Sequence, residues 1–449
     1  MTVAVARIRD VSYSFEDYKY RTPIKFGGVA LDKVTILNVA MQIEAAGKTV
    51  AGYGSMPLSN VWSFPSRTLA YDETLGAMVA LVDNIADIYR SCNLAGHPID
   101  ITHALEPEFF PAADRLGAKR ALAEPIPRLA TMVVASPFDA ALHDGFGKAL
   151  GLNCYKTYGR DLLRHDLGHY LGPEFAGGHL SSFVRTEPQP KMPLYHLVGA
   201  VDPLTAADVK TPVGDGLPES LAEWIAADGL THMKVKLNGD DIGWDVDRVM
   251  QVNAVAEGVQ RQRGVTQWFY SLDFNERCKD VAYLVEFLTT LKARSPAGYD
   301  RVQYVEQPTA RDLKANRQNV MHAAAKLKPV VIDESLLDLE SLLIAREMGY
   351  TGVAFKACKG QTQTLLLAAA AQIFGMFRCV QDLTCSGASL IQSAGIAAHI
   401  PGVAAIEANS RQYCPIANAG WTERYPGVFT TRDGTMNTAI LNGPGLGAA

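Results

Sequence analysis

Charged side chains follow short apolar runs at five points between residues 231 and 360. The runs are THMKVKLN, WFYSLDFNE, RVQYVEQP, PVVIDES and GVAFKACKG, and they carry Lys234 and Lys236, Asp273 and Asn275, Glu306, Asp333 and Glu334, and Lys356. Apolar and β-branched residues that lead up to a charge are typical of strands buried in a parallel sheet, whose last residues emerge at its carboxyl edge. We therefore predict that these charges share one rim.

The spacing of the runs predicts repeating strand–helix units. From Lys236 to Asp273 is 37 residues, and the next three intervals, to Glu306, Asp333 and Lys356, are 33, 27 and 23 residues. Each interval holds one strand, one helix and two loops. Residues two apart on a strand face the same side, so Lys234 points with Lys236, and Asn275 points with Asp273. Three carboxylates and a lysine pair should converge.

Three more runs complete a barrel. MPLYHLVGA at 192–200 predicts a first strand, FRCVQDL at 377–383 a seventh and VAAIEAN at 403–409 an eighth. The chain has 449 residues, whereas a (β/α)8 barrel takes about 250, so two domains are expected. The predicted fold class is α/β, a modified (β/α)8 (TIM-type) barrel with an N-terminal α+β capping domain.

The remaining segments are assigned around this barrel. The first 53 residues predict a meander of strands, and helical patterns follow at 68–94, 107–123 and 128–150. The expected domains are a cap over 1–135 that the tail, about 410–449, completes, a catalytic barrel over 190–410, and a connecting helix and irregular linker over 136–189. The linker is rich in glycine and proline.

Composition excludes several other classes of protein. A net charge of −5, with 48% hydrophobic residues and no dense basic stripe, gives no sign of nucleic-acid binding. Seven cysteines without CxxC pairs are typical of reduced thiols in a cytoplasm. The opening MTVAVARIRD lacks the apolar core of a signal peptide, and the apolar run at 364–377 is too short to cross a bilayer. We expect a cytoplasmic protein without membrane contact.

A histidine pair outside the predicted rim favours no site of its own. His165 and His169 lie four residues apart and would share one helical face. Gly168 weakens that helix, and the glutamate of an HExxH motif is missing. The interpretation as surface histidines is therefore preferred over metal ligands.

Together the five runs resemble the enolase superfamily, and the lysine pattern is most similar to its muconate lactonizing enzyme branch. The resemblance rests on Lys-x-Lys, Asp-x-Asn, Glu-Gln-Pro, Asp-Glu-Ser and a final lysine in this order. DAALHDGFGKALG at 139–151 resembles the helix before the family's barrel, with His143 where a tryptophan is usual. The sequence departs from the branch at Lys356-Ala-Cys-Lys359-Gly360-Gln361, and its seventh strand lacks the histidine of the mandelate racemase branch.

The resemblance implies a Mg²⁺ ion, or Mn²⁺ in its place, held by Asp273, Glu306 and Asp333. Lys236 and Lys356 would then be acid and base on opposite faces of a bound carboxylate. These roles agree with the chemistry of the residues. Oxygen ligands suit Mg²⁺, and its charge offsets the second negative charge that forms when a proton beside a carboxylate leaves. This use of a lysine base with Mg²⁺ is a documented pattern of the superfamily.

Further residues are assigned to the substrate. We expect Lys234 to contact the substrate carboxylate and to lower the pKa of Lys236 by repulsion, and Asn275, Glu334 and Glu407 to complete the binding site. Two loops, residues 18–31 and 54–65, are predicted to form a lid. In the first, Arg21 and Lys25 precede the pair Gly27 and Gly28 and would hold a second anionic group, and the second contains Asn60 and Trp62.

The function that follows is metal-dependent removal of the α-proton of a small-molecule carboxylate to give a Mg-stabilised enolate. The reaction would end in racemisation or epimerisation, in cycloisomerisation or in β-elimination, and an acid-sugar dehydratase is the alternative within this chemistry. Two other classes stay open: a Schiff-base lyase that uses Lys356, and a metal-binding homologue without catalysis. A homo-oligomer is expected.

Overall fold

A closed barrel of parallel strands forms the centre of the computed structural model, which describes residues 4–26 and 29–447. The strands are β4 (Lys191–Val198), β5 (His232–Lys236), β6 (Phe269–Asp273), β7 (Val302–Glu306), β8 (Val330–Ile332), β9 (Gly352–Lys356), β10 (Phe377–Gln381) and β11 (Val403–Glu407). Each pairs with the next in parallel, and β11 pairs with β4 to close the ring. The predicted fold class is confirmed.

Helices between the strands cover the outside of the barrel. They are α6 (Leu221–Asp228), α7 (Ile242–Arg263), α8 (Val281–Arg294), α9 (Pro296–Asp300), α10 (His322–Ala325), α11 (Leu339–Glu347), α12 (Gln361–Ile373) and α13 (Ala388–His399). Local sequence marks their ends. Asp241 caps the start of α7 by accepting a hydrogen bond from Trp244 N, and Gly264 ends it in the left-handed conformation.

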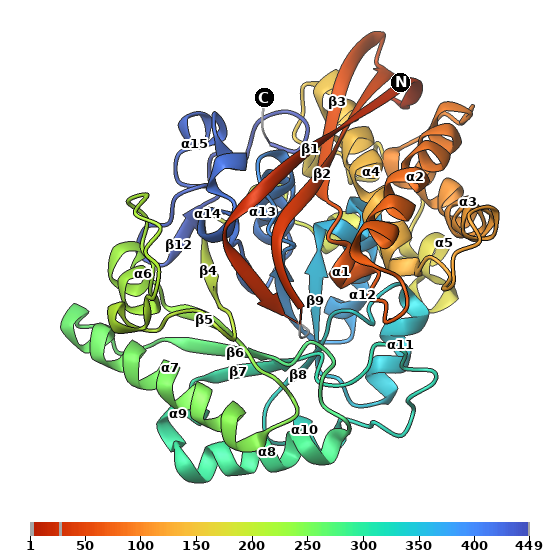
Figure 1. Cartoon of the computed structure of the whole chain (residues 1–449). Helices are drawn as coiled ribbons and strands as arrows, with labels where there is room; N and C mark the ends of the chain where they lie inside the picture. Colours follow the sequence, from red (N-terminus) through yellow and green to blue (C-terminus); the bar gives the residue numbers. More distant parts are fainter. Residues whose placement is uncertain (1–3, 27–28, 448–449) are drawn as a thin grey trace.

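The amino-terminal segment forms a three-stranded antiparallel sheet and helices, called the cap below. Its strands are β1 (Arg7–Phe26), β2 (Val29–Ala45) and β3 (Lys48–Pro57), and its helices are α1 (Asn60–Ser63), α2 (Tyr71–Arg90) and α3 (Pro98–Lys119). In Figure 1 the red strands and orange helices lie to one side of the barrel strands, and the green helices α7 and α8 lie on the other.

The predicted loop over residues 18–31 is wrong. Its described residues continue β1 and β2, with Lys19 opposite Lys33 and Ile24 opposite Leu31. The register shifts between these two pairs, where Pro23 has no N–H to donate to the partner strand. Gly27 and Gly28 lie outside the described residues. The long hairpin carries the basic residues as strand side chains.

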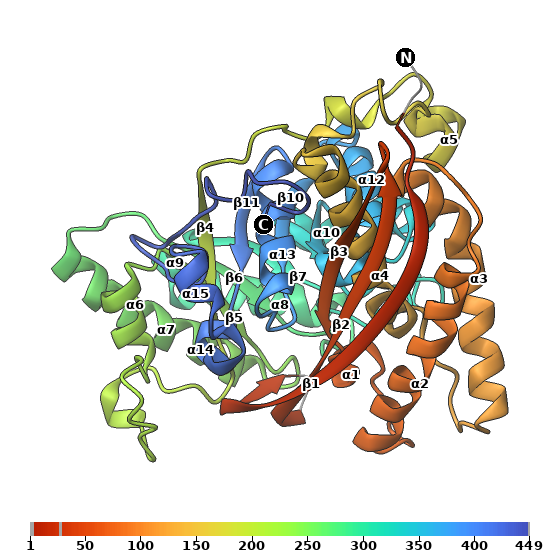
Figure 2. The same cartoon turned by 90° about the horizontal axis from the view of Figure 1, so that it is seen from above.

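Helix α4 (Arg128–Leu150) joins the cap to the barrel. It is hydrophobic around nearly its whole circumference and almost entirely buried, as expected for a helix packed on several sides. On one side it packs directly on β3, and the close approach is made through Gly52 and Gly54. Figure 2 shows the three strands running together beside α4. The cap sheet therefore rests on this helix.

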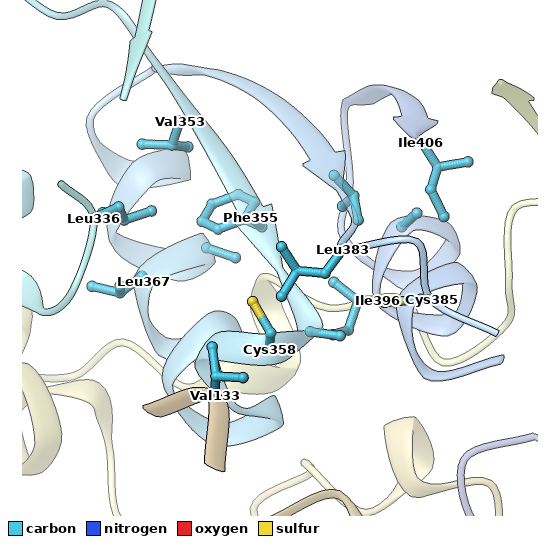
Figure 3. Packing of buried hydrophobic residues seen from close by; sticks show 14 of the residues in the cluster. Val133, Leu336, Val353, Phe355, Cys358, Leu367, Leu383, Cys385, Ile396 and Ile406 are labelled. Atoms are coloured by element: carbon cyan, nitrogen blue, oxygen red, sulfur yellow. The ribbon is translucent and has the colours of Figure 1, made fainter. Parts of the chain in front are cut away.

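On its other side α4 contacts the loop that follows the sixth barrel strand. Figure 3 shows Val133 of α4 pointing toward Cys358 and Leu383, next to Phe355 of β9. Asp139 also accepts hydrogen bonds from the backbone N–H and the hydroxyl of Thr362, at 2.7 and 2.8 Å. The helix thus fixes the turn after β9, which carries Lys359 and directly follows Lys356.

The segments before and after the barrel also pack against it. Residues 154–182 contain only short helical turns and α5 (Leu167–Leu171). Beyond the barrel, α14 (Ser410–Tyr413) and α15 (Trp421–Arg424) precede β12 (Thr435–Asn437), which pairs antiparallel with β4. Leu446 N then donates a 2.9 Å hydrogen bond to Asp144 of α4. The tail contacts both the barrel and the connecting helix.

Within the described ranges, every helix is too short or too polar to cross a membrane.

Replacing Gly54 with alanine should destabilise the protein. A Cβ there would overlap the carbonyl oxygen of Pro137 on α4, so the sheet and helix would have to move apart. We expect a loss of roughly 1–3 kcal/mol or more in the free energy of unfolding, measured by denaturant titration. The control is Gly258→Ala, an exposed position of α7 with nothing within 4 Å of the added methyl group. It should gain up to about 1 kcal/mol, and equal stabilities of the two variants would contradict the packing argument.

Candidate functional site

The predicted charges lie together at the carboxyl end of the barrel. Lys236 is the register partner of Asp273, which is the partner of Glu306, so these three ends stand at one level of the rim. Lys356 is level with Gln381 on the other side. The side chains are buried, with Asp273 and Glu306 at 0% exposure. The parallel register brings the charges together as the sequence predicted.

Lys234 lies among the carboxylates. Its Nζ donates hydrogen bonds to Glu306 Oε1 at 2.7 Å, Gln381 Oε1 at 2.6 Å and Glu407 Oε2 at 3.0 Å, and lies 3.1 Å from Asp273 Oδ2. Burial would lower the pKa of Lys234, but these carboxylates more than offset it and hold the pKa well above its ordinary value. The ammonium lines the site, and its donors are already engaged by protein groups.

Lys236 belongs to a chain of contacts that reaches the cap. Its Nζ lies 2.5 Å from Asp273 Oδ2 and 2.9 Å from Asn275 Oδ1. The Asn275 amide donates to Glu334 Oε1 at 3.2 Å, and the indole N–H of Trp62 donates to the same oxygen at 3.0 Å. Asn275 and Glu334 therefore position Lys236, and Trp62 of α1 completes the chain.

Lys356 occupies the opposite wall. Its Nζ lies 3.2 Å from Asp333 Oδ2, donates to the backbone oxygen of Asp382 at 3.1 Å, and stands 4.6 Å from the centre of the Trp62 ring. Burial lowers its pKa, but the charge of Asp333 raises it further, so Lys356 is an ammonium in this arrangement. Lys359 Nζ approaches the other oxygen of Asp333 at 3.2 Å.

The buried charges at this rim do not balance. Six carboxylates face four ammonium groups: Asp273, Glu306, Asp333, Glu334, Asp382 and Glu407 against Lys234, Lys236, Lys356 and Lys359. With all of them ionised the cluster has two surplus negative charges. Burial, together with neighbouring carboxylates, accordingly raises the pKa of Glu306 well above its usual range and raises the pKa values of Glu334 and Asp382 to about 7.

This surplus fits a divalent cation with oxygen ligands. Glu306 Oε2 is buried without a hydrogen-bond partner among the described residues, whereas Asp333 Oδ2 is paired only with the Lys356 ammonium. Buried carboxylates are ordinarily paired or bound to metal. As the side chains stand, no three acidic, cysteine or histidine groups of residues 4–26 and 29–447 meet closely enough to form a metal-binding group. The ammonium groups of Lys234 and Lys356 lie between the acids. Donor type and charge nonetheless suit Mg²⁺.

Two predicted substrate-binding residues are not brought to this site. The Arg21 guanidinium contacts Asp215 through Nε at 2.6 Å and Nη2 at 2.9 Å, and also donates to Leu217 O. Arg21 and Lys25 do not line the cavity above the rim, which Lys33 of β2 lines instead. For Arg21 the reason is its ion pair with Asp215, on a loop after β4. Glu407, in contrast, faces the cavity as expected.

Sequence reasoning missed Asp382 and Gln381, which follow and end β10. Asp382 lines the cavity, and Gln381 accepts a hydrogen bond from Lys234. The signal was present, since FRCVQDL is an apolar run that ends in a charge, like the five central runs.

Comparison with known proteins identifies the family. Residues 216–449, more than half of the chain, match the family model described as Enolase C-terminal domain-like. The chain therefore belongs to this family of the enolase superfamily. No curated protein sequence matches it.

Solved structures share the fold over nearly the whole chain. A dipeptide epimerase from Enterococcus faecalis V583, in complex with Mg and the dipeptide L-Leu-L-Tyr, has a TM-score of 0.65 and 13% identity, covering 98% of this chain and 99% of that one. An enolase from Bradyrhizobium, in complex with magnesium and mandelic acid, has a TM-score of 0.64 and 16% identity. The match covers 100% of this chain and 96% of that one. A muconate lactonizing enzyme from Pseudomonas fluorescens, in complex with muconolactone, has a TM-score of 0.64 and 16% identity. The match covers 99% of this chain and 96% of that one. These similarities show that the chain shares the fold of these structures over nearly its whole length.

Removing the Trp62 contacts should loosen the cap. Trp62→Phe keeps an aromatic ring beside Lys356 but loses the hydrogen bond to Glu334, so we expect a loss of about 1–2 kcal/mol in unfolding free energy. Trp62→Leu also removes the ring and should lose more. The control is Trp244→Phe, whose indole nitrogen has no hydrogen-bond partner in the described part of the chain. Denaturant titrations that give equal values for all three variants would contradict the assigned contact.

Asp382 should make stability depend on pH. Its folded pKa is raised to about 7 by burial and by Glu407, so the folded state holds a proton that the unfolded state has released. The contribution of protonated Asp382 to the free energy of unfolding is complete below about pH 4 and is lost as the pH rises through 7. Asp382→Asn lacks this titration. Its stability relative to the wild type should therefore improve from pH 5 to pH 8, by on the order of 1–3 kcal/mol. Parallel pH profiles in chemical denaturation would refute the raised pKa.

Proposed function

We propose that this protein is a Mg²⁺-dependent enzyme that removes the α-proton of a carboxylate substrate and returns a proton to the same carbon, as a racemase or epimerase. One observation carries the proposal: Lys236 and Lys356 end β5 and β9, which stand four strands apart in a closed ring of eight. They therefore face each other across the barrel mouth. Each face of a bound carbon acid would meet one lysine.

Asp273, Glu306 and Asp333 would hold the ion, as the unpaired buried Oε2 of Glu306 and the surplus negative charge of the cluster support. When bound, Mg²⁺ would supply positive charge beside the substrate carboxylate and so make its α-proton more acidic. Crystal structures of two similar proteins contain Mg together with a dipeptide or mandelic acid. These neighbours support the choice of metal and of substrate head group.

The two lysines would divide the proton transfers. Lys356 is held as an ammonium by Asp333 and so starts as a proton donor. Lys236, after losing its own proton to solvent, would take the proton from the other face as a neutral amine, held in position by Asp273 and Asn275. Lys234 would balance charge beneath the substrate rather than bind it, because its hydrogen bonds go to Glu306, Gln381 and Glu407.

The other candidate functions have less support. A Schiff-base lyase needs Lys356 as a neutral amine, whereas its raised pKa keeps it protonated. An acid-sugar dehydratase needs donors and acceptors for several hydroxyl groups, and the upper part of the cavity is mainly apolar. A homologue without catalysis would have no use for two buried lysines on opposite walls.

Lysine variants should separate catalysis from metal binding. Lys236→Met and Lys356→Met keep side-chain length but remove the acid and base, so each should abolish racemisation of any carboxylate that the wild type converts. In D₂O, NMR should show that at least one variant still exchanges the α-proton of one enantiomer only, as two bases on opposite faces require. Loss of all exchange in both variants would contradict the division of roles.

Calorimetric titration with Mg²⁺ supplies the matching control. Removing an ammonium increases the surplus negative charge, so neither lysine variant should bind Mg²⁺ more weakly than the wild type. Asp273→Asn should weaken binding by at least about 10–100-fold, the loss seen even when an outer-shell partner is removed. The exposed Lys279→Ala should leave affinity and turnover unchanged. Unaltered Mg²⁺ affinity in Asp273→Asn would refute the metal site.

A further inference from the structure

The cavity above the rim has two unlike halves. The barrel contributes the charged half, which includes Lys236, Asp273 and Lys356. The cap and two barrel leucines contribute the other half, where the apolar lining residues are Ile24, Leu31, Val34, Leu75, Leu197 and Leu383. A substrate whose carboxylate lies at the rim must place its remaining atoms against this second surface.

Two polar side chains on the cap side are engaged with the protein, and three others that line the cavity carry hydroxyl groups, namely Tyr20, Ser59 and Tyr71. Thr35 donates to Asp17 Oδ1 at 2.5 Å, and the Asn60 amide donates to Tyr71 O at 3.0 Å and Thr74 Oγ1 at 2.9 Å. Hydroxyl groups of a polar substrate would find few free partners here. Burying them without hydrogen bonds is unfavourable, so a polyhydroxylated chain is poorly matched.

A second anionic group is also poorly matched. Asp382 and Glu407 already place two carboxylates on this cavity, and Arg21 is bound by Asp215 elsewhere. Among described residues, the cap contributes one charged side chain to the lining, Lys33. Its side chain is 54% exposed and lies 3.6 Å from Asp72, so it is a solvated surface ion pair. The described lining of the cavity therefore includes no buried cation from the cap for a distal carboxylate.

We propose that the substrate is a monocarboxylate whose distal part is an uncharged, apolar aliphatic or aromatic group. The carboxylate lies at the rim, and the apolar group packs between Ile24 and Leu31 of the cap hairpin, Leu75 of α2 and Leu197 of β4. This inference rests on the proposed function for the position of the carboxylate. The four side chains that it adds determine specificity.

Three carboxylates of similar length test the proposal: 4-phenylbutanoate, adipate and gluconate. Binding is measured by calorimetry on the full chain, with and without Mg²⁺. Burying a phenyl group contributes about a tenfold to hundredfold gain in affinity, so 4-phenylbutanoate should bind at least about tenfold more tightly than either of the others. Equal or tighter binding of adipate or gluconate, or no measurable binding of any probe, overturns the proposal.

A matched pair of variants locates the apolar surface. Leu31→Lys puts an ammonium into the cavity and should weaken 4-phenylbutanoate while strengthening adipate, so that the preference between them falls at least about tenfold. Ala30→Lys adds the same charge on the adjacent exposed residue, which does not line the cavity, and should leave the preference unchanged. An unchanged preference in Leu31→Lys, or the same change in both variants, overturns the placement of the distal group.

The metal titration separates this inference from the proposed function. A wild-type protein that binds Mg²⁺ but prefers adipate contradicts the substrate class alone. A wild-type protein that binds no Mg²⁺ but still prefers 4-phenylbutanoate, with the preference reduced by Leu31→Lys, contradicts the proposed function and supports the apolar site.

Discussion

Burial of opposite charges at the barrel mouth is the interaction on which the site depends. Each ammonium group is removed from water and must be compensated by nearby carboxylates, which requires the strand ends to keep their register. Below the rim, an apolar layer that includes Tyr195, Tyr304 and Cys379 fills the barrel and excludes water. Above it, the cap closes the other side. Charges in such a water-poor space act on one another strongly, and small displacements change their pKa values.

The cap therefore contributes contacts to the charged site as well as covering it. Trp62 contacts the Lys356 side through its ring face and the Lys236 side through Glu334 and Asn275. A single side chain from α1 thus touches the supports of both lysines. Arg311 fixes the same turn by donating to Trp62 O at 3.1 Å and pairing with Glu276. Displacement of this turn would disturb both walls of the site together.

The sequence was informative where one regular pattern controlled both local structure and function. Lys236, Asp273 and Glu306 were predictable because each ends a buried strand, and parallel strands bring their carboxyl ends to one rim. The hairpin at residues 18–26 was not, because its aromatic, basic and proline residues resemble a loop, and pairing with β2 overrode that local signal. The partner of Arg21 was not predictable either, since Asp215 is 194 residues away on an irregular loop. Local rules say nothing of such distant pairs.

Substrate preference was the most difficult feature to predict for the same reason. The number of basic residues in the hairpin is visible in the sequence, but which of them keeps a free charge depends on tertiary partners. Arg21 is paired with Asp215 on a barrel loop, and the hairpin's buried contributions to the cavity lining include Ile24 and Val34. An ion pair with a residue far away in the sequence thus decides which basic residues of the hairpin could bind an anion in the cavity.

The contact between Leu446 and Asp144 constrains the order in which the chain folds during synthesis. The two residues are 302 positions apart, and the ring itself closes only when β11 reaches β4. On the ribosome, α4 must remain without this partner until residue 446 has emerged. Loop closure over so many residues is slow. The buried surface of α4 would meanwhile be exposed to chaperones. The yield of active protein in a cell should therefore depend on events after translation of the barrel more than on the speed at which individual helices form.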